Sequence, residues 1–389
     1  MKLLVIAFNH YDNIFAYTSA LCAYTDMDVT VLVVGYGDRF ATSSFEADLR
    51  TYVYGMNRNV RQSLFPKELD ESLNSKLSIC LLRLAPKKVT VKNLMINWLH
   101  CYLAAMRLKN CFDVIHFNGV GLPALLLSNF LKNTKKILTI HDYVPHTGEG
   151  GTRTDAANRK LVSRFNHFFQ HYDYLSDSFA KYYRIDRSKV FTVRSGTFDH
   201  FRVFSPVIPE QKGYMLVFGR ISPYKGLRYL VEAFNASCED SQGHDLVIAG
   251  NGDIGDIQST IDKQPRIHLI HKRLTINELV GLVMNARYVL CTYTDVTHSA
   301  VVVVAYTFGK PVLVHNVGGL SEVVFPGETG VLIDNLEPNS IWEGIRQMDQ
   351  LLATGMPESH ISDLGQHGCL SWAKIAQDYQ RVYSQVMAE

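Results

Sequence analysis

The sequence of 389 residues lacks several features that would assign it to a class at once. Its seven cysteines form no Cys-x-x-Cys pair, and it contains no HExxH motif, no cluster of cysteine and histidine, and no Asp-x-Asp directly after a predicted strand. We therefore expect neither a metal nor another cofactor. No apolar run reaches the ~18 residues that cross a bilayer, so the sequence offers no candidate for a membrane-spanning helix.

We expect no secretory signal, because the N-terminus opens directly into MKLLVIAF. An odd number of cysteines cannot all pair within one chain, so we expect reduced thiols and a cytoplasmic protein. Charge is unevenly spread. Residues 1–200 hold 25 Lys+Arg and 17 Asp+Glu, a balance of +8, which leaves 14 and 20, a balance of −6, for the rest. Such a split suggests that one half meets an anionic partner.

Apolar runs of strand length alternate with helix-length segments along the whole chain. The eight clearest runs are 3–8, 29–34, 114–117, 136–140, 214–219, 245–250, 288–293 and 311–315. This alternation predicts an α/β fold with parallel sheets covered by helices on both faces. The segment HFRVFSPVIPEQKG (200–213) has two prolines and no helical period. We therefore predict domains at 1–203 and 213–365, and a C-terminal helix within 370–389 that packs on either domain.

The segment VFGRISPYKG (217–226) carries two cations directly after a strand. Arg220 and Lys225 lie five residues apart. A planar guanidinium and a point-charge ammonium at the mouth of a sheet can clamp a diphosphate. The alternative is a pair of solvated cations beside a turn.

A second segment, 293–334, predicts a helix N-terminus in the same region. Its apolar run 300–306 ends before Gly309-Lys310-Pro311, which stops a helix. Ser299, Ala300 and Val301 then lie at the helix start, where free N–H groups favour phosphate. Gly318-Gly319 follows the next strand and allows close backbone approach, with Glu322 shortly after. The alternative is an ordinary βαβ unit with glycines in its turns.

Together these segments resemble the donor half of the glycosyltransferase family 4 group. Its pattern is GR-x-x-x-x-KG, then GKPV, GG-x-x-E-V-V and G-x-x-G-x-L, and the chain carries each in order at 219–226, 309–312, 318–324 and 327–332. The resemblance implies a GT-B fold, in which two Rossmann-like domains face each other across a cleft. It also implies a retaining transfer of sugar from a nucleotide-sugar to a carbohydrate or lipid-linked acceptor, as in a divergent bacterial branch of surface polysaccharide assembly, without a metal.

The resemblance assigns roles to several of these residues. Arg220 and Lys225 would neutralise the donor diphosphate, and Gly250 would form a turn beside the nucleotide. The remaining donor contacts would come from Gly219, His298, Ser299, Ala300, Val301, Gly318, Gly319 and Glu322.

The chain departs from the family at two positions. Where the family commonly has two glutamates, one on the donor sugar and one on the ribose, this sequence has Val296 and Val304. A valine cannot accept a hydroxyl proton, so either ribose recognition comes from elsewhere or the nucleotide is held loosely. Asp295, one residue before the first of these positions, is the expected substitute. The departure also motivates an alternative reading as a non-catalytic nucleotide or sugar-phosphate binding protein on the same fold.

The first half supports the resemblance through KILTIHDYVPHTGEGG (136–151), which is similar to the family's T-x-HD segment. The family histidine after this strand lies against the transferred sugar, which carries over to His141; the alternative is a structural histidine. Acceptor contacts are expected from His10, after the first strand, and from Asp142, His146 and Glu149. The segment SGTFDHF (195–201) resembles the family's interdomain segment, with Gly196 as a hinge.

Two further readings stay open. GNGDIG (250–255) is a formal G-x-G-x-x-G after a strand, the mark of an NAD(P)-dependent dehydrogenase. Such a site needs a carboxylate at the end of the next strand, whereas IHLIHKRL (267–274) has none. Separately, no acidic residue occurs between Glu71 and Asp113, while basic and apolar residues interleave over 76–109. This stretch predicts either an anionic membrane surface as partner or a solvated basic face; no nucleic-acid motif accompanies it.

Overall fold

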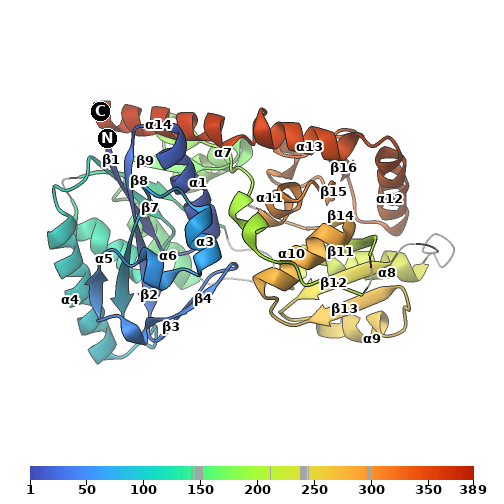
Figure 1. Cartoon of the computed structure of the whole chain (residues 1–389), viewed down its shortest axis with the longest axis horizontal. Coiled ribbons are helices and arrows are strands. Elements are labelled where there is room, and N and C mark those ends of the chain that lie inside the picture. The colour runs from blue at the N-terminus through green and yellow to red at the C-terminus, as the bar shows by residue number, and fades with distance from the viewer. Residues whose placement is uncertain are drawn as a thin grey trace. The chain divides into compact units, whose positions relative to one another are not determined.

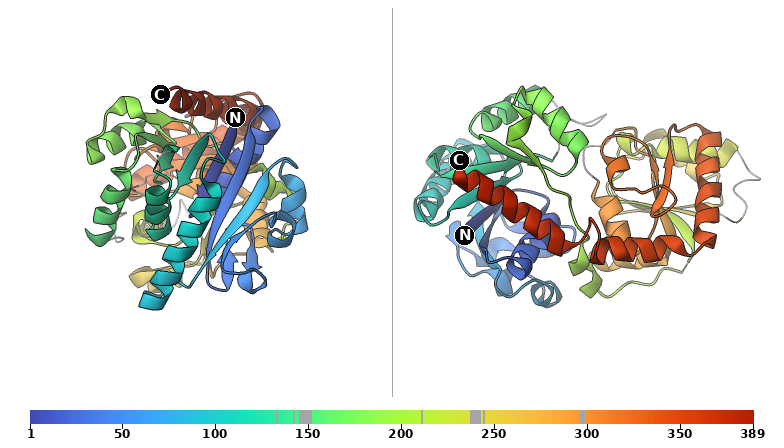
Figure 2. Two further views of the ribbon diagram at one scale, coloured as in Figure 1. Left: turned by 90° about the vertical axis from the view of Figure 1, so that its left-hand side faces the viewer. Right: turned by 90° about the horizontal axis from the view of Figure 1, so that it is seen from above.

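The computed structural model describes residues 1–132, 134–141, 143–144, 152–210, 212–236, 243, 245–295 and 299–389. Among these residues the chain forms two compact units, each with its own sheet. The first holds residues 1–143, 152–196 and 370–389, and the second holds residues 197–369. Figures 1 and 2 show the elements of each unit.

The first unit is built on an eight-stranded sheet of order β10-β9-β8-β7-β1-β2-β6-β5. Every neighbouring pair is parallel except β5 with β6, and Val5 lies opposite Val31 in the central pair. A short antiparallel hairpin, β3–β4, follows β2. The strands are β1 (Lys2–Ala7), β2 (Asp28–Tyr36), β3 (Arg39–Ala41), β4 (Glu46–Asp48), β5 (Gly55–Asn57), β6 (Ser78–Leu84), β7 (Val114–Asn118), β8 (Lys135–Thr139), β9 (His167–Gln170) and β10 (Val190–Thr192).

Helices connect these strands. They are α1 (Tyr11–Tyr24), α2 (Arg61–Leu64), α3 (Lys67–Ser72), α4 (Val91–Leu108), α5 (Leu122–Phe130), α6 (Thr152–Val162) and α7 (Asp173–Tyr183), with 3-10 turns η1 (Leu49–Thr51) and η2 (Arg187–Lys189). The C-terminal helix α14 (Trp372–Ala388) packs beside α1 and against β7 and β8, which assigns the predicted tail helix to the first unit (Figures 1 and 2).

A buried polar network fastens α14 to the sheet. Nδ1 of His116 on β7 lies 2.8 Å from the Tyr383 hydroxyl, and its Nε2 lies 2.8 Å from the hydroxyl of Thr139. Tyr17 on α1 stacks on Tyr379 at 4.7 Å between ring centroids. Burial lowers the pKa of His116 to about 3, so the ring stays neutral and each nitrogen keeps a partner.

The second unit has a six-stranded parallel sheet of order β13-β12-β11-β14-β15-β16. This is the doubly wound arrangement of dinucleotide-binding folds, in which the strand order reverses between the first and fourth strands, here β11 and β14. The strands are β11 (Tyr214–Phe218), β12 (Leu246–Gly250), β13 (Ile267–His271), β14 (Ala286–Cys291), β15 (Val312–His315) and β16 (Gly330–Ile333).

The helices of the second unit cover both faces of this sheet. They are α8 (Leu227–Ala236), α9 (Gln258–Ile261), α10 (Ile276–Asn285), α11 (Ala300–Thr307), α12 (Pro338–Ala353) and α13 (Met356–Gln366), with 3-10 turns η3 (Asp199–Val203), η4 (Pro223–Lys225), η5 (Gly255–Ile257) and η6 (Leu320–Glu322). Trp342 on α12 ties this helix to α8, because its indole N–H donates to the carbonyl of Ala233 at 2.9 Å. Thr275 and Glu278 form a capping box that starts α10.

All eight apolar runs are strands, so the predicted α/β class with parallel sheets is confirmed. Two details differ. The chain leaves the first unit after Gly196 rather than near residue 203, since η3 packs with α10 and α11. The second unit also continues past residue 365, to Cys369.

The interpretation of 76–109 as one basic and apolar surface is wrong for its first part. Residues 78–84 form β6, whose apolar side chains are buried in the sheet. Arg83 is buried as well, and it pairs with Asp38 at 2.8 Å and donates to the Gly37 carbonyl at 2.9 Å. No helix in the described part of the chain is long and apolar enough to cross a membrane.

Candidate active site

The strand-order reversal of the second unit brings the predicted donor residues together at the carboxyl ends of β11 and β14. Gly219 and Arg220 follow β11, and Lys225, five residues after Arg220, ends η4 in the same loop. Tyr293 and Ser299 come after β14, and Ser299 is the N-cap of α11. In open α/β sheets this edge is where ligands bind.

Lys225 is the most unusual residue of this group because its side chain is only 6% exposed. Its Nζ donates a hydrogen bond of 2.9 Å to the hydroxyl of Tyr293 and lies 4.6 Å from the centroid of that ring. Burial lowers the pKa of Lys225 from 10.5 to about 8. An anion that reaches the ammonium would restore its charge.

A second cation adds to this effect. The charge of Arg220 also lowers the pKa of Lys225, while Cys291 on β14 acts in the opposite direction. Arg220 itself is exposed. Two cations near each other repel, and a ligand with two adjacent negative charges relieves that repulsion.

The start of α11 reaches the same point. Ser299 Oγ donates to the Tyr293 hydroxyl at 3.5 Å, so Lys225, Tyr293 and Ser299 form a chain. A Cβ atom placed on Gly219 would lie 3.6 Å from Lys225 Nζ and 3.9 Å from Val301 Cγ2. The structure thus brings Gly219, Lys225, Ser299 and Val301 together at the N-terminus of an eight-residue helix.

Tyr293 was not predicted, although it organises this group. It is buried, and its backbone carbonyl accepts from Nδ1 of His315 at 2.6 Å. The only signal in the sequence is its position after the β14 strand, which many structural tyrosines share.

Two glycines of the site permit close backbone contacts. Gly226 has φ of +66°, and a Cβ there would lie 1.8 Å from the carbonyl oxygen of Thr292. Gly250 lies against Gly219, whose carbonyl oxygen would be 1.8 Å from a Cβ at Gly250. Both positions are therefore closed to larger residues, and the loops after β11, β12 and β14 lie in direct contact.

The other predicted donor residues lie on neighbouring loops. Gly318, with φ of +59°, and Gly319 follow β15, and Glu322 ends η6. Asp295 is partly exposed after β14, and Ala300 is the exposed first residue of α11. Val296 and His298 lie outside the described residues.

Val304 occupies the position at which the family pattern has a glutamate. It lies on α11 with an exposed fraction of 3%, inside the core. Neither its chemistry nor its position allows it to bond a ribose hydroxyl.

The first unit places imidazoles at the carboxyl end of its own sheet. His10 precedes α1 and is exposed, and its ring stacks on that of His141 at 3.8 Å between centroids. His141 follows β8, is 3% exposed, and places Nε2 2.7 Å from Oδ1 of Asn118 at the end of β7. His10 has φ of +51°, a left-handed conformation that a non-glycine residue adopts at a cost.

A third imidazole, His171 after β9, extends this stack and was not predicted. Its ring lies 5.3 Å from that of His141. Nδ1 lies 3.2 Å from the carbonyl of Val193 and Nε2 lies 3.4 Å from the amide of Asn13, contacts that suit a neutral ring protonated at Nδ1. Burial lowers the pKa of His171 to about 4, so the ring is neutral near pH 7. Asp142, His146 and Glu149 lie outside the described residues.

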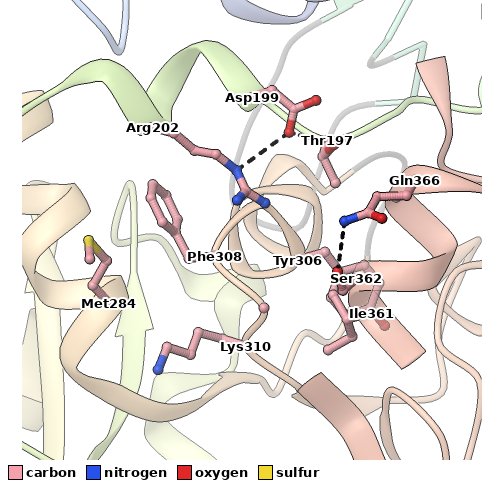
Figure 3. Close-up of a pocket in the computed structure, with 12 residues that line it drawn as sticks. Thr197, Asp199, Arg202, Met284, Tyr306, Phe308, Lys310, Ile361, Ser362 and Gln366 are labelled. Atoms are coloured by element: carbon pink, nitrogen blue, oxygen red, sulfur yellow. Dashed lines mark hydrogen bonds and ion pairs between the residues drawn. The ribbon is translucent and has the colours of Figure 1, made fainter. Parts of the chain in front are cut away.

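A cavity of about 730 Å³ occurs elsewhere in the second unit, near the C-terminal ends of α10, α11 and α13 (Figure 3). Arg202 and Lys310 line it, and Arg202 faces Asp199 at 3.6 Å. Carbonyl groups at helix C-termini favour cations, so these side chains complement the helix ends. None of the predicted donor residues lines this cavity.

Residues 212–350 match the family model described as Glycosyl transferases group 1. An uncharacterized glycosyltransferase of Methanocaldococcus jannaschii is 27% identical over 188 residues, which cover 46% of this chain and 47% of that protein. A D-inositol 3-phosphate glycosyltransferase of an Arthrobacter species is 29% identical over 200 residues, 48% of this chain and 44% of that protein. These matches span a little under half the length of the curated relatives.

Solved structures match over the whole length. Sucrose-phosphate synthase from Thermosynechococcus elongatus superimposes with a TM-score of 0.64 at 16% identity, covering 100% of this chain and 99% of that one. The Anabaena protein HepE, in complex with UDP-glucose, gives 0.66 at 14% identity, covering 99% and 100%. The chain has the GT-B fold. The matched segment 212–350 lies in the second unit, which carries Arg220, Lys225 and α11.

Proposed function

We propose that this chain is a glycosyltransferase that moves a sugar from a nucleotide-sugar to a carbohydrate or lipid-linked acceptor. The observation that carries the proposal is the buried Lys225 ammonium beside Arg220 and the N-terminus of α11, in a segment that matches a glycosyltransferase family model. Three positive groups at one sheet edge suit the diphosphate that leaves during sugar transfer. HepE, whose structure contains UDP-glucose, supports this ligand class.

In this proposal Arg220, Lys225 and the start of α11 stabilise negative charge that grows on the departing diphosphate. Because these groups supply the neutralising charge, no divalent metal is needed. Transfer with retention of anomeric configuration and a role in surface polysaccharide assembly belong to the proposal through the resemblance to glycosyltransferase family 4.

The acceptor and the transferred sugar would meet the imidazole stack of the first unit. His10 is its exposed member and is suited to bond acceptor hydroxyls. His141 is held by Asn118 and is suited to contact the transferred sugar. His171 is a positioning residue, since it packs behind His141 and is itself held by Val193 and Asn13.

Ligand-induced thermal stabilisation tests the donor part of the proposal. A ligand that binds only the native state raises the free energy of unfolding, by about 2.7 kcal/mol at 100 times its Kd. We expect a UDP, GDP or ADP species to raise Tm. Arg220→Ala should abolish this rise, while Arg346→Ala, at an exposed arginine paired with Glu343 on α12, should keep it.

Sugar transfer itself is measured by release of nucleoside diphosphate that depends on acceptor. Binding without release in the presence of acceptor would favour the non-catalytic reading. A Tm rise with NAD(P) alone would favour a dehydrogenase and contradict the proposal.

We further propose that α4 seats the enzyme on an anionic membrane surface. Its outward face is apolar, with Val91, Met95 and Trp98 exposed by 75%, 68% and 49%. Trp98 also stacks on Tyr102 at 5.7 Å. Exposed cations flank this face at both ends of the helix: Lys87, Lys88, Lys92, Arg107 and Lys109. Apolar side chains beside cations, with no acidic residue between, suit anionic lipid headgroups.

Vesicle sedimentation tests this seat. The protein should sediment with vesicles that contain phosphatidylglycerol, less at high salt, and little with phosphatidylcholine alone. The double variant Met95→Glu with Trp98→Glu should stay in the supernatant, while Gln350→Glu on α12 should sediment like wild type. Equal binding by both variants would contradict the role of α4.

A further inference from the structure

Another cavity of the second unit, about 350 Å³ in volume, opens beside the turn that carries Lys225. It is bounded by the loops after β11 and β12, the first turn of α8, and Thr294 after β14. Its lining residues are Ile221, Ser222, Pro223, Gly226, Leu227, Arg228, Tyr229, Asp253, Ile254, Gly255, Ile257 and Thr294. Every wall therefore comes from the ligand-binding edge of the sheet.

One wall presents a hydroxyl that needs a partner. Ser222 is 8% exposed, and its Oγ bonds no atom among the described residues. Buried hydroxyl groups in native proteins are nearly always hydrogen-bonded, because leaving one unpaired costs free energy. A partner supplied by a ligand in the cavity resolves this exception.

Another wall presents a carboxylate. Asp253 follows β12 by three residues and is exposed, and its Oδ1 accepts the backbone N–H of Gly255 at 2.9 Å. β11, α8 and β12 are the first strand, first helix and second strand of the doubly wound sheet. In such sheets an acidic residue at the end of the second strand bonds ribose hydroxyls.

A nucleotide-sugar bound to this chain needs a hydrogen-bond acceptor for its ribose hydroxyls. The position at which the resembled family places its ribose carboxylate is Val304, buried in α11. Arg220 and Lys225 would hold the diphosphate, one ester bond from the ribose. Pro223 and Gly226 line the cavity on either side of Tyr224 and Lys225. Lys225, the proposed ligand of the diphosphate, and the cavity therefore share one short turn.

We infer that Asp253 and Ser222 bind the ribose of the donor nucleotide in this cavity. The inference rests on the proposed function, because it takes a nucleotide-sugar as the ligand. Asp253 accepts hydrogen bonds from the 2′- and 3′-hydroxyls, and Ser222 satisfies its own hydroxyl on the same sugar. Ribose recognition thereby moves from the helix after β14 to the loop after β12.

Paired ribo- and deoxyribonucleotides test the inference. The nucleoside diphosphate that stabilises the wild type is titrated by calorimetry beside its 2′-deoxy form and beside inorganic pyrophosphate. A hydrogen bond to a charged group corresponds to about 10- to 100-fold in affinity, so we expect the ribo form to bind that much more tightly. Asp253→Asn should bring the ratio to about 1–3, because the ribo form weakens to the level of the deoxy form.

Asp253→Asn keeps an oxygen for the Gly255 N–H, so the loop should keep its shape. Asp262→Asn, at an exposed carboxylate on the same unit, serves as the matched control and should keep the full ratio. Ser222→Ala should weaken the ribo form about 2- to 10-fold. Pyrophosphate binding should be unchanged in Asp253→Asn and lost in Lys225→Ala.

The outcomes separate the two proposals. If wild type binds neither pyrophosphate nor any nucleoside diphosphate, the proposed function itself fails. If both bind through Lys225 but Asp253→Asn keeps the preference for ribose, the inference is overturned while the function stands. Loss of that preference in Asp295→Asn instead would place ribose at Asp295 and also overturn it.

Discussion

Replacing Lys225 with an apolar residue of similar size should raise the free energy of unfolding. Its pKa of about 8 in the native protein, against 10.5 in an unfolded chain, reflects burial of an ammonium. At about 1.36 kcal/mol per tenfold change in proton affinity, holding the charged form costs about 3 kcal/mol at pH 7. Methionine removes this cost but also loses the hydrogen bond that Nζ donates to the Tyr293 hydroxyl, which offsets about 1 kcal/mol of the gain. Lys225→Met should therefore stabilise the protein by about 1–2 kcal/mol at pH 7 and abolish sugar transfer.

The pH dependence of this difference is the sharper measurement. Because the native pKa of Lys225 is depressed, its cost is full below about pH 8 and disappears as pH rises toward 10.5. The linkage contribution is about 3 kcal/mol at pH 7 and about 1.4 kcal/mol at pH 9.5. Urea denaturation of wild type and Lys225→Met at both values isolates it, since all other titrating groups cancel.

Lys263→Met, at an exposed lysine of the same unit, is the matched control and should show no pH-dependent difference. A Lys225→Met protein that gains no stability at pH 7 relative to pH 9.5 would refute the reasoning. It would mean that the ammonium is solvated or paired in the native state, and the site would not favour an incoming anion.

Four further expectations follow from the same contacts. Gly226→Ala should lower the free energy of unfolding by more than about 3 kcal/mol, because its Cβ would lie 1.8 Å from the Thr292 carbonyl oxygen. Gly309→Ala should lower it by only about 1 kcal/mol in the same urea denaturation assay, because φ is +69° there but no atom lies within 4 Å of the added Cβ. Donor affinity measured by calorimetry should fall above about pH 8, because diphosphate favours protonated Lys225. The native pKa values of His171, about 4, and His116, about 3, lie below the unfolded value of 6.5, so stability that is present above pH 6.5 should be lost as pH falls. His171→Asn should reduce the slope of unfolding free energy against pH in this range by up to one proton. EDTA should leave transfer unchanged, and loss of activity that Mg²⁺ restores would contradict the metal-free proposal.

The sequence predicted the parts of the fold that have a local signal. Strands such as β1, β11 and β14 are continuous apolar runs, and the start and end of α11 are marked by Ser299 and Gly309. β6 was missed because Lys76, Arg83 and Lys87 in and around it suggested a surface. Arg83 is buried nonetheless, since Asp38 and backbone carbonyls satisfy its guanidinium. Those partners are distant in sequence, so no local pattern could have announced them.

The candidate site shows the same division. Arg220 and Lys225 could be predicted because they belong to a motif of fixed spacing. The glycines could be predicted because only glycine allows two backbone segments to approach so closely. Tyr293, His171 and Asn118 were not readable, since each acts through a partner on another strand. The cavity at Asp253 was hidden for a related reason. The G-x-G-x-x-G spacing of its loop drew attention to the glycines, whereas the carboxylate within it lies in place only when β12 is the second strand of the sheet.

Three unfavourable features lie at the carboxyl ends of strands. Lys225 holds a buried charge, Ser222 an unpaired hydroxyl, and His10 a left-handed backbone. Other buried polar groups are satisfied, as in His116 with Tyr383 and Thr139. Strain at a ligand-binding edge is expected where binding or catalysis uses it. A scaffold without a ligand has no use for a buried ammonium that costs about 3 kcal/mol at pH 7. The buried ammonium of Lys225 therefore favours a functional anion-binding site over a fold that has lost its ligand. A sugar-transfer assay then tests whether that site is catalytic.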